Sequence, residues 1–283
     1  MLTVLEAIKL SDEYLQKYGI DSPRLNAELL LAAIINCKRL DLYLLYDRPL
    51  NEAELNQYRE FLKRRSKHEP LQYIIGYVEF YGLKFIVNNS TLIPRPETEL
   101  LVEFVLKNVV KTMPLRLLDI GAGTGNICIS LLKNLQAASA VGIDVLDETL
   151  KIAHLNSQAN SVGERLELIN LDVMKNNLCE LGKFDLIISN PPYISSTDFD
   201  KLEPELRLHE PEVALTDYAD GYSFFERIIS ISKDLLNPGG KLYFELGQHQ
   251  HIKVKQLMET NGYLNINIVK DYSSIERIIS GEI

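Results

Sequence analysis

The segment with the most distinctive chemistry is the tetrapeptide Asn190-Pro191-Pro192-Tyr193. It directly follows the apolar run 184–189, which predicts a buried parallel strand. The tetrapeptide is therefore expected at the carboxyl end of a strand, where open α/β sheets bind their ligands. Two consecutive prolines stiffen the backbone, and Pro191 also holds Asn190 in an extended conformation. The loop would present one side-chain amide, one carbonyl and one aromatic ring.

These groups suit a planar NH2 substrate. The side-chain oxygen of Asn190 and the carbonyl of Pro191 can each accept one N–H hydrogen bond, which would aim the nitrogen lone pair at an electrophile. Tyr193 can stack on the flat substrate group, and Pro192 completes the binding loop. Asn190, Pro191 and Tyr193 are thus the candidate catalytic residues, acting by positioning and electrostatics. Taken alone, the tetrapeptide is equally compatible with a plain turn after a strand.

A candidate nucleotide-type site lies upstream, where the strand 115–120 leads through a glycine loop into the helix 126–135. Glycines let the backbone approach a ligand closely, and the helix N-terminus offers free N–H groups. The glycine spacing is G-x-G-x-G and differs from the G-x-G-x-x-G of dinucleotide-binding proteins.

Acidic residues accompany this glycine loop at three strands. Asp144 ends the next strand and can accept both hydroxyls of a ribose. Asp172 follows a third strand, where it could accept an adenine amine, and Val173 could pack on the adenine ring. Asp119 could orient the loop or meet an ammonium group. This pattern indicates a site for S-adenosylmethionine, a cationic cofactor. The residues expected to bind it are Asp119, Gly121, Ala122, Gly123, Thr124, Gly125, Asp144, Asp172, Val173 and Asn190.

Three regions follow from the periodicity of the chain. Residues 1–70 predict a small helical bundle, and residues 71–93 predict a β-hairpin linker with strands at 73–77 and 83–87. Residues 94–283 alternate strands with helices, which predicts an α/β domain with a doubly wound, mostly parallel sheet. The sequence 237–240, Asn-Pro-Gly-Gly, is expected to form a turn before the strand 241–246.

Composition limits the function classes. No apolar stretch in the 283 residues reaches the ~18 needed to span a membrane, no signal peptide is evident, and three scattered cysteines fit a reducing cytoplasm. The absence of a Cys-x-x-Cys pair argues against a metal site.

Residues 1–70 hold 11 Lys/Arg and 11 Asp/Glu, so the whole net charge of −9 lies in residues 71–283. A nucleic-acid-binding groove would be basic, so no direct nucleic-acid contact is expected.

The exception is a basic run from Arg59 to His68. The favoured interpretation of this run is a solvated helix face, and the alternative is a docking surface for a partner.

The glycine loop and the tetrapeptide together resemble those of Rossmann-like (class I) N-methyltransferases that act on amino groups. More narrowly, the chain resembles the HemK/PrmC family of peptide chain release factor glutamine N5-methyltransferases. That resemblance rests on the stretches 92–99 (Leu-Ile-Pro-Arg-Pro-Glu-Thr-Glu), 76–81 and 210–215, on Asp271-Tyr272 with Glu276-Arg277, and on the helical N-terminal region. It covers nearly the whole chain.

The resemblance implies methylation of the glutamine in the Gly-Gly-Gln motif of class I release factors. It implies that residues 121–125 and Asp144 hold the cofactor, with Val173 near the adenine, and that residues 190–193 hold the glutamine amide. It also implies that the helical region contacts the release factor. Ala122 stands where relatives often carry Thr or Ser, and it is small enough that no loss is expected.

Other functions remain alternatives at this point. An adenine-N6 methyltransferase of RNA or DNA would share the tetrapeptide, but the charge distribution opposes it. A nucleotide-binding sensor without catalysis would leave the tetrapeptide unexplained. A dehydrogenase is disfavoured by the glycine spacing.

Overall fold

The computed structural model describes residues 2–283, and the chain forms two compact units. The first, here the helical unit, comprises the chain up to Tyr77 together with Glu203–His209. The second, here the sheet unit, comprises Val78–Leu202 and Glu210–Ile283. Within residues 2–283, no helix is both long and apolar enough to cross a bilayer.

The helical unit is built from short helices around a core of its own, which includes Val4, Leu15, Leu30, Leu31 and Tyr58. The helices Val4–Lys17 and Glu52–Arg65 each begin with a capping box. In it, the side-chain oxygen of the N-cap residue and a glutamate three residues later accept from free backbone N–H groups. The elements are α1 (Val4–Lys17), α2 (Pro23–Ile35), η1 (Arg39–Leu45), α3 (Glu52–Arg65), α4 (Leu71–Ile75) and α9 (Pro204–His209).

The basic run at the end of α3 is largely structural. Arg65 is only 6% exposed, and it donates to Glu205 of α9 at 2.7 Å, to the Asn26 side chain and to the Glu69 carbonyl. Arg64 is paired with Glu69. The expectation of a solvated helix face is therefore wrong for both arginines, because these side chains tie elements of the helical unit together.

The expected β-hairpin exists, with β1 (Tyr77–Phe80) and β2 (Leu83–Ile86) forming a two-stranded sheet. Residues 73–75, expected in its first strand, instead lie in α4. Pro70 caps that helix, and Gly76 ends it with a φ of 88°, which only glycine adopts without strain. The aromatic and branched composition that favoured a strand is overridden by these two end signals. The division between the two units falls within β1.

The sheet unit confirms the predicted doubly wound, mostly parallel sheet. Its seven strands lie in the order β5-β4-β3-β6-β7-β9-β8, in which all pairs from β5 to β7 are parallel and β9 pairs antiparallel with both neighbours. The strands are β3 (Arg116–Ile120), β4 (Ser139–Asp144), β5 (Leu166–Asn170), β6 (Phe184–Ser189), β7 (Leu236–Glu245), β8 (Leu264–Lys270) and β9 (Glu276–Glu282).

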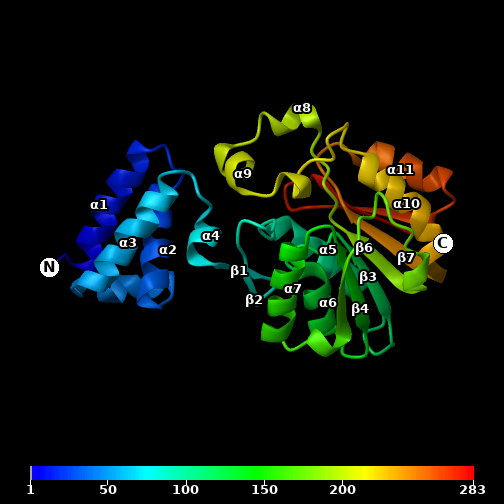
Figure 1. Cartoon of the computed structure of the whole chain (residues 1–283), viewed down its shortest axis with the longest axis horizontal. Helices are drawn as coiled ribbons and strands as arrows, with labels where there is room; N and C mark the ends of the chain where they lie inside the picture. Colours follow the sequence, from blue (N-terminus) through cyan, green and yellow to red (C-terminus); the bar gives the residue numbers. More distant parts are fainter. Residues whose placement is uncertain (1) are drawn as a thin grey trace. The chain divides into compact units, whose positions relative to one another are not determined.

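Helices cover both faces of this sheet. Figure 1 shows α5 (Pro96–Lys107), α6 (Asn126–Asn134) and α7 (Asp147–Ala159) on one face, with α10 (Ser223–Leu235) and α11 (His251–Thr260) on the other. Successive strand residues alternate between two cores: Leu117 and Ile188 pack with α5 and α6, whereas Leu118 packs with α10. The remaining short helices are η2 (Gly163–Arg165), η3 (Cys179–Leu181), α8 (Ser196–Phe199) and η4 (Glu212–Ala214).

The strand order reverses between β3 and β6. From β3 the chain proceeds outward through β4 and β5, then returns to place β6 on the other side of β3, where Ile120 lies opposite Ser189. Ligands of open α/β sheets bind at such a switch point, outside the carboxyl ends of the strands. The loops that follow β3 and β6 therefore open into the same crevice.

The predicted turn at 237–240 lies inside β7 as an irregularity. Phe184 of β6 pairs with Leu236, and the next pair joins Leu186 to Lys241, so the intervening residues bulge from the ladder. Gly239 has a φ of 77° in this bulge. The residue types signalled a local departure from extended geometry, but strand pairing resumes directly after it.

Asn156 of α7 ties the hairpin to the glycine loop. Its side chain is fully buried, accepts from the N–H of Ile86 at 2.7 Å and donates to the carbonyls of Ile86 and Thr124. These bonds satisfy backbone groups of β2 and of the loop after β3 at the same time.

Replacing this side chain should therefore destabilise the sheet unit. We expect Asn156→Ala to lower the free energy of unfolding by roughly 2–4 kcal/mol, because the Thr124 carbonyl and both backbone groups of Ile86 lose their partner. Urea unfolding would measure this. The exposed His154→Ala on the same helix should change it by less than about 0.5 kcal/mol, and a similar loss in both variants would contradict the assignment.

Candidate active site

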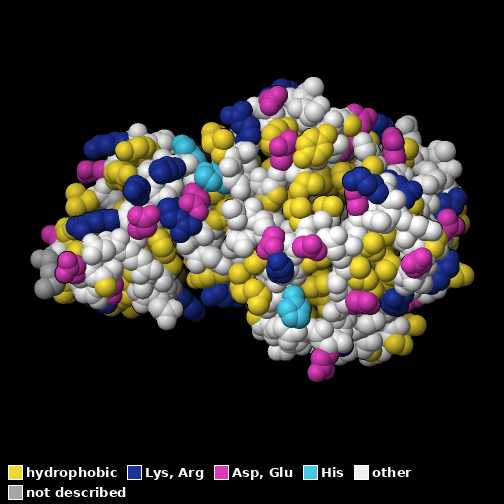
Figure 2. All heavy atoms as spheres, viewed as in Figure 1, with side chains coloured by type: hydrophobic (Ala, Val, Ile, Leu, Met, Phe, Trp, Pro, Cys, Tyr) yellow, Lys and Arg dark blue, Asp and Glu magenta, His cyan; other side chains and the backbone are white. Residues whose placement is uncertain are grey.

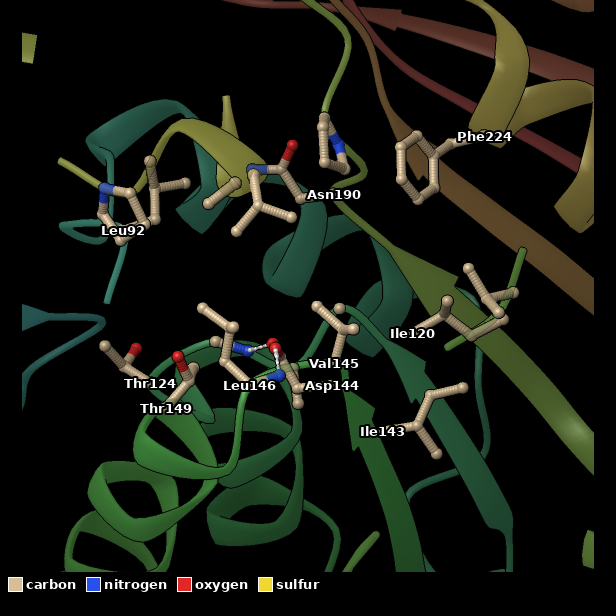
Figure 3. A pocket seen from close by; sticks show the side chains of 18 of the residues that line it. Leu92, Ile120, Thr124, Ile143, Asp144, Val145, Leu146, Thr149, Asn190 and Phe224 are labelled. Carbon is tan, nitrogen blue, oxygen red and sulfur yellow. Dashed lines mark hydrogen bonds between the residues drawn. The ribbon is translucent and has the colours of Figure 1, made fainter. Parts of the chain in front are cut away.

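A cavity of about 360 Å³ opens at the switch point. Figure 3 shows Asn190 and Phe224 on one side of it, and Asp144, Leu146 and Thr149 across from them. Of the predicted site residues, those that line the cavity are Gly121, Ala122, Gly123, Thr124, Asp144, Asp172, Val173, Asn190 and Pro192. Strands β3, β4, β5 and β6 thus each contribute a predicted residue at or after their carboxyl ends.

The glycine loop depends on its glycines. Gly121, Gly123 and Gly125 all have φ between 57° and 77°, a region that other residues rarely adopt. A side chain at Gly125 would also meet Ile129 Cδ1 at 2.7 Å. Gly125 does not line the cavity but forms the N-cap of α6, so its role is to turn the chain.

Asp144 fastens this loop to the end of β4. Its Oδ2 accepts from the N–H of Gly123 at 3.0 Å, and its Oδ1 accepts from the N–H of Leu146 at 3.1 Å. Burial raises the pKa of this carboxyl, opposed by these backbone hydrogen bonds. The lone pairs left on its oxygens can still accept hydroxyl groups of a ligand in the cavity.

Asp119 lies behind the loop and does not line the cavity. It is 1% exposed, its Oδ2 accepts from the N–H of Cys128 at 3.1 Å, and its Oδ1 has no partner within residues 2–283. Burial raises its pKa to about 6. Of the two roles predicted for Asp119, these contacts fit orientation of the loop and the start of α6.

Asp172 and Val173 line the cavity after β5. Both carboxylate oxygens of Asp172 have partners: Oδ1 accepts from the N–H of Met174, and Oδ2 pairs with Lys175 at 2.8 Å, which lowers the Asp172 pKa. Val173 is buried, and Met174 beside it lines the same wall. An apolar wall with a carboxylate at its edge fits an adenine, and this role stays a prediction.

Asn190 is held from the side of α5. Its Nδ2 donates to the hydroxyl of Thr98 at 3.3 Å. That contact fixes which end of the amide is engaged by the protein and leaves Oδ1 as the acceptor for a ligand. The adjoining Pro192 lines the cavity, whereas Pro191 does not.

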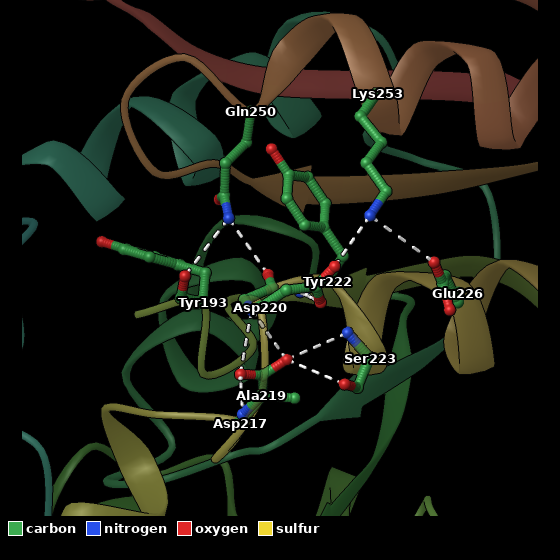
Figure 4. A network of polar contacts seen from close by, with 10 residues as sticks. Tyr193, Asp217, Ala219, Asp220, Tyr222, Ser223, Glu226, Gln250 and Lys253 are labelled. Carbon is green, nitrogen blue, oxygen red and sulfur yellow. Dashed lines mark hydrogen bonds and ion pairs between the residues drawn. The ribbon is translucent and has the colours of Figure 1, made fainter. Parts of the chain in front are cut away.

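Tyr193 lies away from the cavity rather than facing a substrate. Its ring packs against Gly247, where an added Cβ would approach the ring to 2.9 Å, and burial raises the pKa of its hydroxyl well above the usual range. Its carbonyl accepts from Gln250 at 3.2 Å. In Figure 4 the same Gln250 amide bridges Tyr193 and the loop before α10, through the carbonyl of Gly221. Tyr193 therefore anchors the end of the tetrapeptide.

Several cavity residues were not predicted as site residues. Arg95 lines the cavity and forms an ion pair with the buried Glu210, which also accepts from the N–H of Ile93. Two of the stretches that carried the family resemblance, 92–99 and 210–215, therefore meet at this cavity. Phe224 at the start of α10 also lines it. No strand-end rule locates these residues, because they come from loops and helix starts.

Glu245 was also missed, although a signal existed. It ends β7, so the rule that located Asp144 applies to it as well. It is 2% exposed, and its Oε2 has no hydrogen-bond partner within residues 2–283. Burial raises its pKa to about 7.

The comparisons with known proteins agree with this site. Residues 96–204 match the model of the methyltransferase small domain, and residues 6–76 match that of the PrmC N-terminal domain. A methyltransferase structure from Pyrococcus furiosus has a similar fold, with a TM-score of 0.51 and 18% identity over 72% of this chain and 90% of that one. Fold and site together define a class I methyltransferase that uses S-adenosylmethionine.

Two relatives narrow the assignment. The release factor glutamine methyltransferase of Geobacter sulfurreducens is 38% identical over 283 residues, covering 99% of this chain and 97% of that protein. The release factor glutamine methyltransferase of Fusobacterium nucleatum is 36% identical over 276 residues, covering 97% of this chain and 77% of that protein. The chain belongs to the release factor glutamine methyltransferase family.

Asp144, which lines the cavity, and Asp119, which is buried behind the loop, should respond differently to substitution. We expect Asp144→Asn to weaken S-adenosylmethionine binding at least about tenfold, because it removes a charged acceptor from the cavity wall. Asp119→Asn keeps the acceptor for Cys128 and should change the affinity by less than about threefold. Calorimetric titration of both variants tests this, and equal losses would contradict the placement of Asp119.

Glu245 should make stability depend on pH. With a folded pKa of about 7 against 4.5 when exposed, the folded chain holds the extra proton between these values, so stability falls as pH rises from 4.5 to 7. Glu245→Gln should be more stable than the parent at pH 8, by up to about 3 kcal/mol, and the difference should shrink towards pH 4.5.

Urea unfolding at pH 5 and pH 8 measures this effect, with the exposed Glu259→Gln as a control that should change neither value by more than about 0.5 kcal/mol. A gap between Glu245→Gln and the parent that stays constant with pH would contradict the assignment.

Proposed function

We propose that this protein methylates the side-chain amide nitrogen, N5, of the glutamine in the Gly-Gly-Gln motif of class I peptide chain release factors. The main support is the orientation of the Asn190 amide. Its Nδ2 donates to Thr98, which leaves Oδ1 to accept from a ligand at the edge of a cavity that fits S-adenosylmethionine. Membership of the release factor glutamine methyltransferase family supports this choice of substrate. Such a substrate belongs to translation, so we place the protein in the cytoplasm.

The chain's own residues would hold the cofactor on the β3–β5 side of the cavity. The glycine loop would offer backbone N–H groups and let the cofactor approach the backbone closely, and Asp144 would accept the ribose hydroxyls. Asp172 would contact the edge of the adenine, and Val173 would pack against its ring. Nothing within 4 Å would oppose a Cβ at Gly121, so the backbone there borders open space. S-adenosylmethionine supplies a methyl group activated by a sulfonium.

Asn190 would hold the substrate on the β6 side. Its Oδ1 accepts one N–H of the glutamine amide, and the Pro191 carbonyl is proposed as the second acceptor. Phe224 lines the cavity next to Asn190 and offers the flat face that Tyr193 does not (Figure 3). An amide nitrogen is a poor nucleophile because its lone pair is delocalised, so orientation should dominate the rate. The nitrogen can lose its proton after alkylation, so this grip needs no general base.

We further propose that the helical region, residues 1–70, docks the release factor. A contiguous exposed apolar patch on a folded unit often marks a binding surface, and Leu25 and Tyr43 line one depression of the helical unit. Within residues 2–70, the large apolar side chains that are at least 40% exposed are Leu10, Tyr18, Leu25, Leu40, Tyr43 and Leu44. The hairpin region, residues 71–93, would then act as the linker to the methyltransferase domain, residues 94–283.

The main alternative, methylation of adenine in RNA or DNA, has less support. On the face in Figure 2, acidic and basic side chains of the described residues are interspersed and form no continuous basic stripe. Two arginines of the basic run are engaged in ion pairs of the helical unit. A polynucleotide backbone requires a concentration of positive charge.

Transfer of a labelled methyl group from S-adenosylmethionine tests the proposal. A purified class I release factor, total RNA and total DNA should be offered separately. We expect label in the release factor alone, and loss of that label when the Gly-Gly-Gln glutamine is changed to alanine. Label only in nucleic acid would overturn the substrate assignment.

Asn190→Ala should separate binding from turnover. We expect at least an approximately 100-fold loss of kcat with unchanged cofactor affinity, because only the acceptor that orients the substrate is removed. Exposed Asn108→Ala at the end of α5 serves as the matched control and should behave like the parent. Full turnover by Asn190→Ala would contradict the proposed grip.

A further inference from the structure

The segment that follows the tetrapeptide is joined to the loop that precedes α10. The N–H of Ile194 donates to the carbonyl of Leu215 at 3.0 Å, and the N–H of Ser196 donates to the carbonyl of Ala219 at 3.0 Å. The two segments thus run side by side in a short parallel pairing. Each is continuous with a part of the substrate side of the cavity, since the tetrapeptide precedes the first segment and Phe224 follows the second.

One side-chain amide connects the same two segments a second time. Gln250, the N-cap residue of α11, is 7% exposed, and its Nε2 donates to the carbonyl of Tyr193 at 3.2 Å and to that of Gly221 at 3.0 Å (Figure 4). Its Oε1 accepts from the N–H of Gly247 at 2.9 Å. Both donor hydrogens and the acceptor oxygen of the amide are therefore used to bridge three backbone segments.

Close packing leaves the bridged segments little room to shift. A Cβ at Gly221 would lie 2.4 Å from the carbonyl oxygen of Tyr193, and the φ of Gly221 is 85°. Both carboxylate oxygens of Asp217 accept from the N–H of Gly221 at 2.9 Å, and one of them also accepts from the N–H of Ser223 at 3.1 Å. Ser223 is the first residue of α10, so the position of Gly221 also determines where the next residue, Phe224, lies.

We propose that Gln250 is a positioning residue for methyl transfer: by bridging the tetrapeptide and the loop before α10, it fixes the Asn190 acceptor relative to the Phe224 ring. The inference rests on the proposed function, in which a planar amide is bound by its edge at Asn190 and by its face at Phe224. Such a grip tolerates little movement of one side against the other, because a displacement of about 1 Å can lower a rate roughly 100-fold.

A second contact from α11 to the same loop is weaker and provides a comparison. Lys253 pairs with Asp220 at 3.0 Å and lies over the ring of Tyr222 at 3.9 Å (Figure 4). The side chains of Lys253 and Asp220 are 41% and 64% exposed, so water and salt screen their attraction. We therefore expect the buried amide of Gln250, and not this ion pair, to hold the loop in place.

Kinetics with the full chain and a release factor substrate test the proposal. Gln250→Glu keeps the size and the acceptor for Gly247 but loses both donors, and Gln250→Met loses all three hydrogen bonds. We expect each to lower kcat roughly 10–100-fold. The affinity for S-adenosylmethionine should stay within about threefold of the parent, because none of the three bonds reaches the loops after β3, β4 and β5.

Gln248 offers a matched control, since it is exposed and lies two residues away. Gln248→Glu and Gln248→Met make the same chemical changes and should keep the parent's kcat within about threefold, as should Lys253→Ala. If Gln250→Glu fails to fold, Gln250→Met decides. A kcat like the parent's in the Gln250 variants, or an equal loss of kcat and cofactor affinity, would overturn the proposal.

A double variant distinguishes positioning from a general loss of structure. If Gln250 acts by placing the Phe224 ring, little is left for it to place once the ring is gone. Gln250→Met should then lower kcat by less than about threefold in the Phe224→Ala background. Fully additive losses would show that Gln250 and Phe224 act independently and would contradict the proposal.

A measurement without substrate separates this inference from the proposed function. The chain has no tryptophan, so Phe224→Trp introduces a single fluorescent reporter. Its anisotropy should fall when Gln250→Met is added and stay the same when Gln248→Met is added; no change with Gln250→Met would overturn the role of Gln250. A fall in anisotropy without methyl transfer by the parent would defeat the proposed function alone. Methyl transfer that survives both Gln250 substitutions would defeat the role of Gln250 alone.

Discussion

The parallel pairing of β3 with β6 is the constraint on which the site depends. It places two loops that are about seventy residues apart in sequence at one edge of the sheet, since Ile120 and Ser189 are partners in the ladder. The hydroxyl of Ser189 reinforces the pairing by donating to the Ile120 carbonyl at 2.7 Å. The glycine loop and the tetrapeptide follow these partners directly, so cofactor and substrate groups are brought together by strand register rather than by loop conformation.

The site concentrates polar groups that a stable core would avoid. Asp119 and Glu245 are withdrawn from water and Asp144 is partly so, and burial raises the pKa of each carboxyl. Asp144 holds the glycine loop, and Asp119 holds the start of α6, each by accepting from a backbone N–H group. Their desolvation cost is offset by the rest of the sheet unit, whose two apolar cores cover both faces of the strands.

Much of this arrangement could be predicted from the sequence, because buried strands, glycine loops and strand ends have local signatures. The strand 184–189, the doubly wound sheet and the lining positions of Asp144 and Asn190 all follow from such patterns. The inward ring of Tyr193 could not, since the direction of a side chain in a loop depends on tertiary neighbours such as Gly247. The helix at 71–75 shows the same limit, because its end signals at Pro70 and Gly76 overrode an apparent strand composition. Glu245 lay within reach of the strand-end rule, because it ends β7.

In the proposed mechanism, Asn190 accepts the amide N–H of a glutamine while the glycine loop and Asp144 hold the cofactor on the opposite wall. A crystal structure of the protein with S-adenosylhomocysteine and a peptide containing Gly-Gly-Gln would show where the glutamine and the ribose bind. We expect the glutamine nitrogen within about 3.2 Å of Asn190 Oδ1, and the ribose hydroxyls bonded to Asp144. A glutamine side chain bound away from Asn190, or an Asn190 amide turned with its nitrogen towards the substrate, would contradict it.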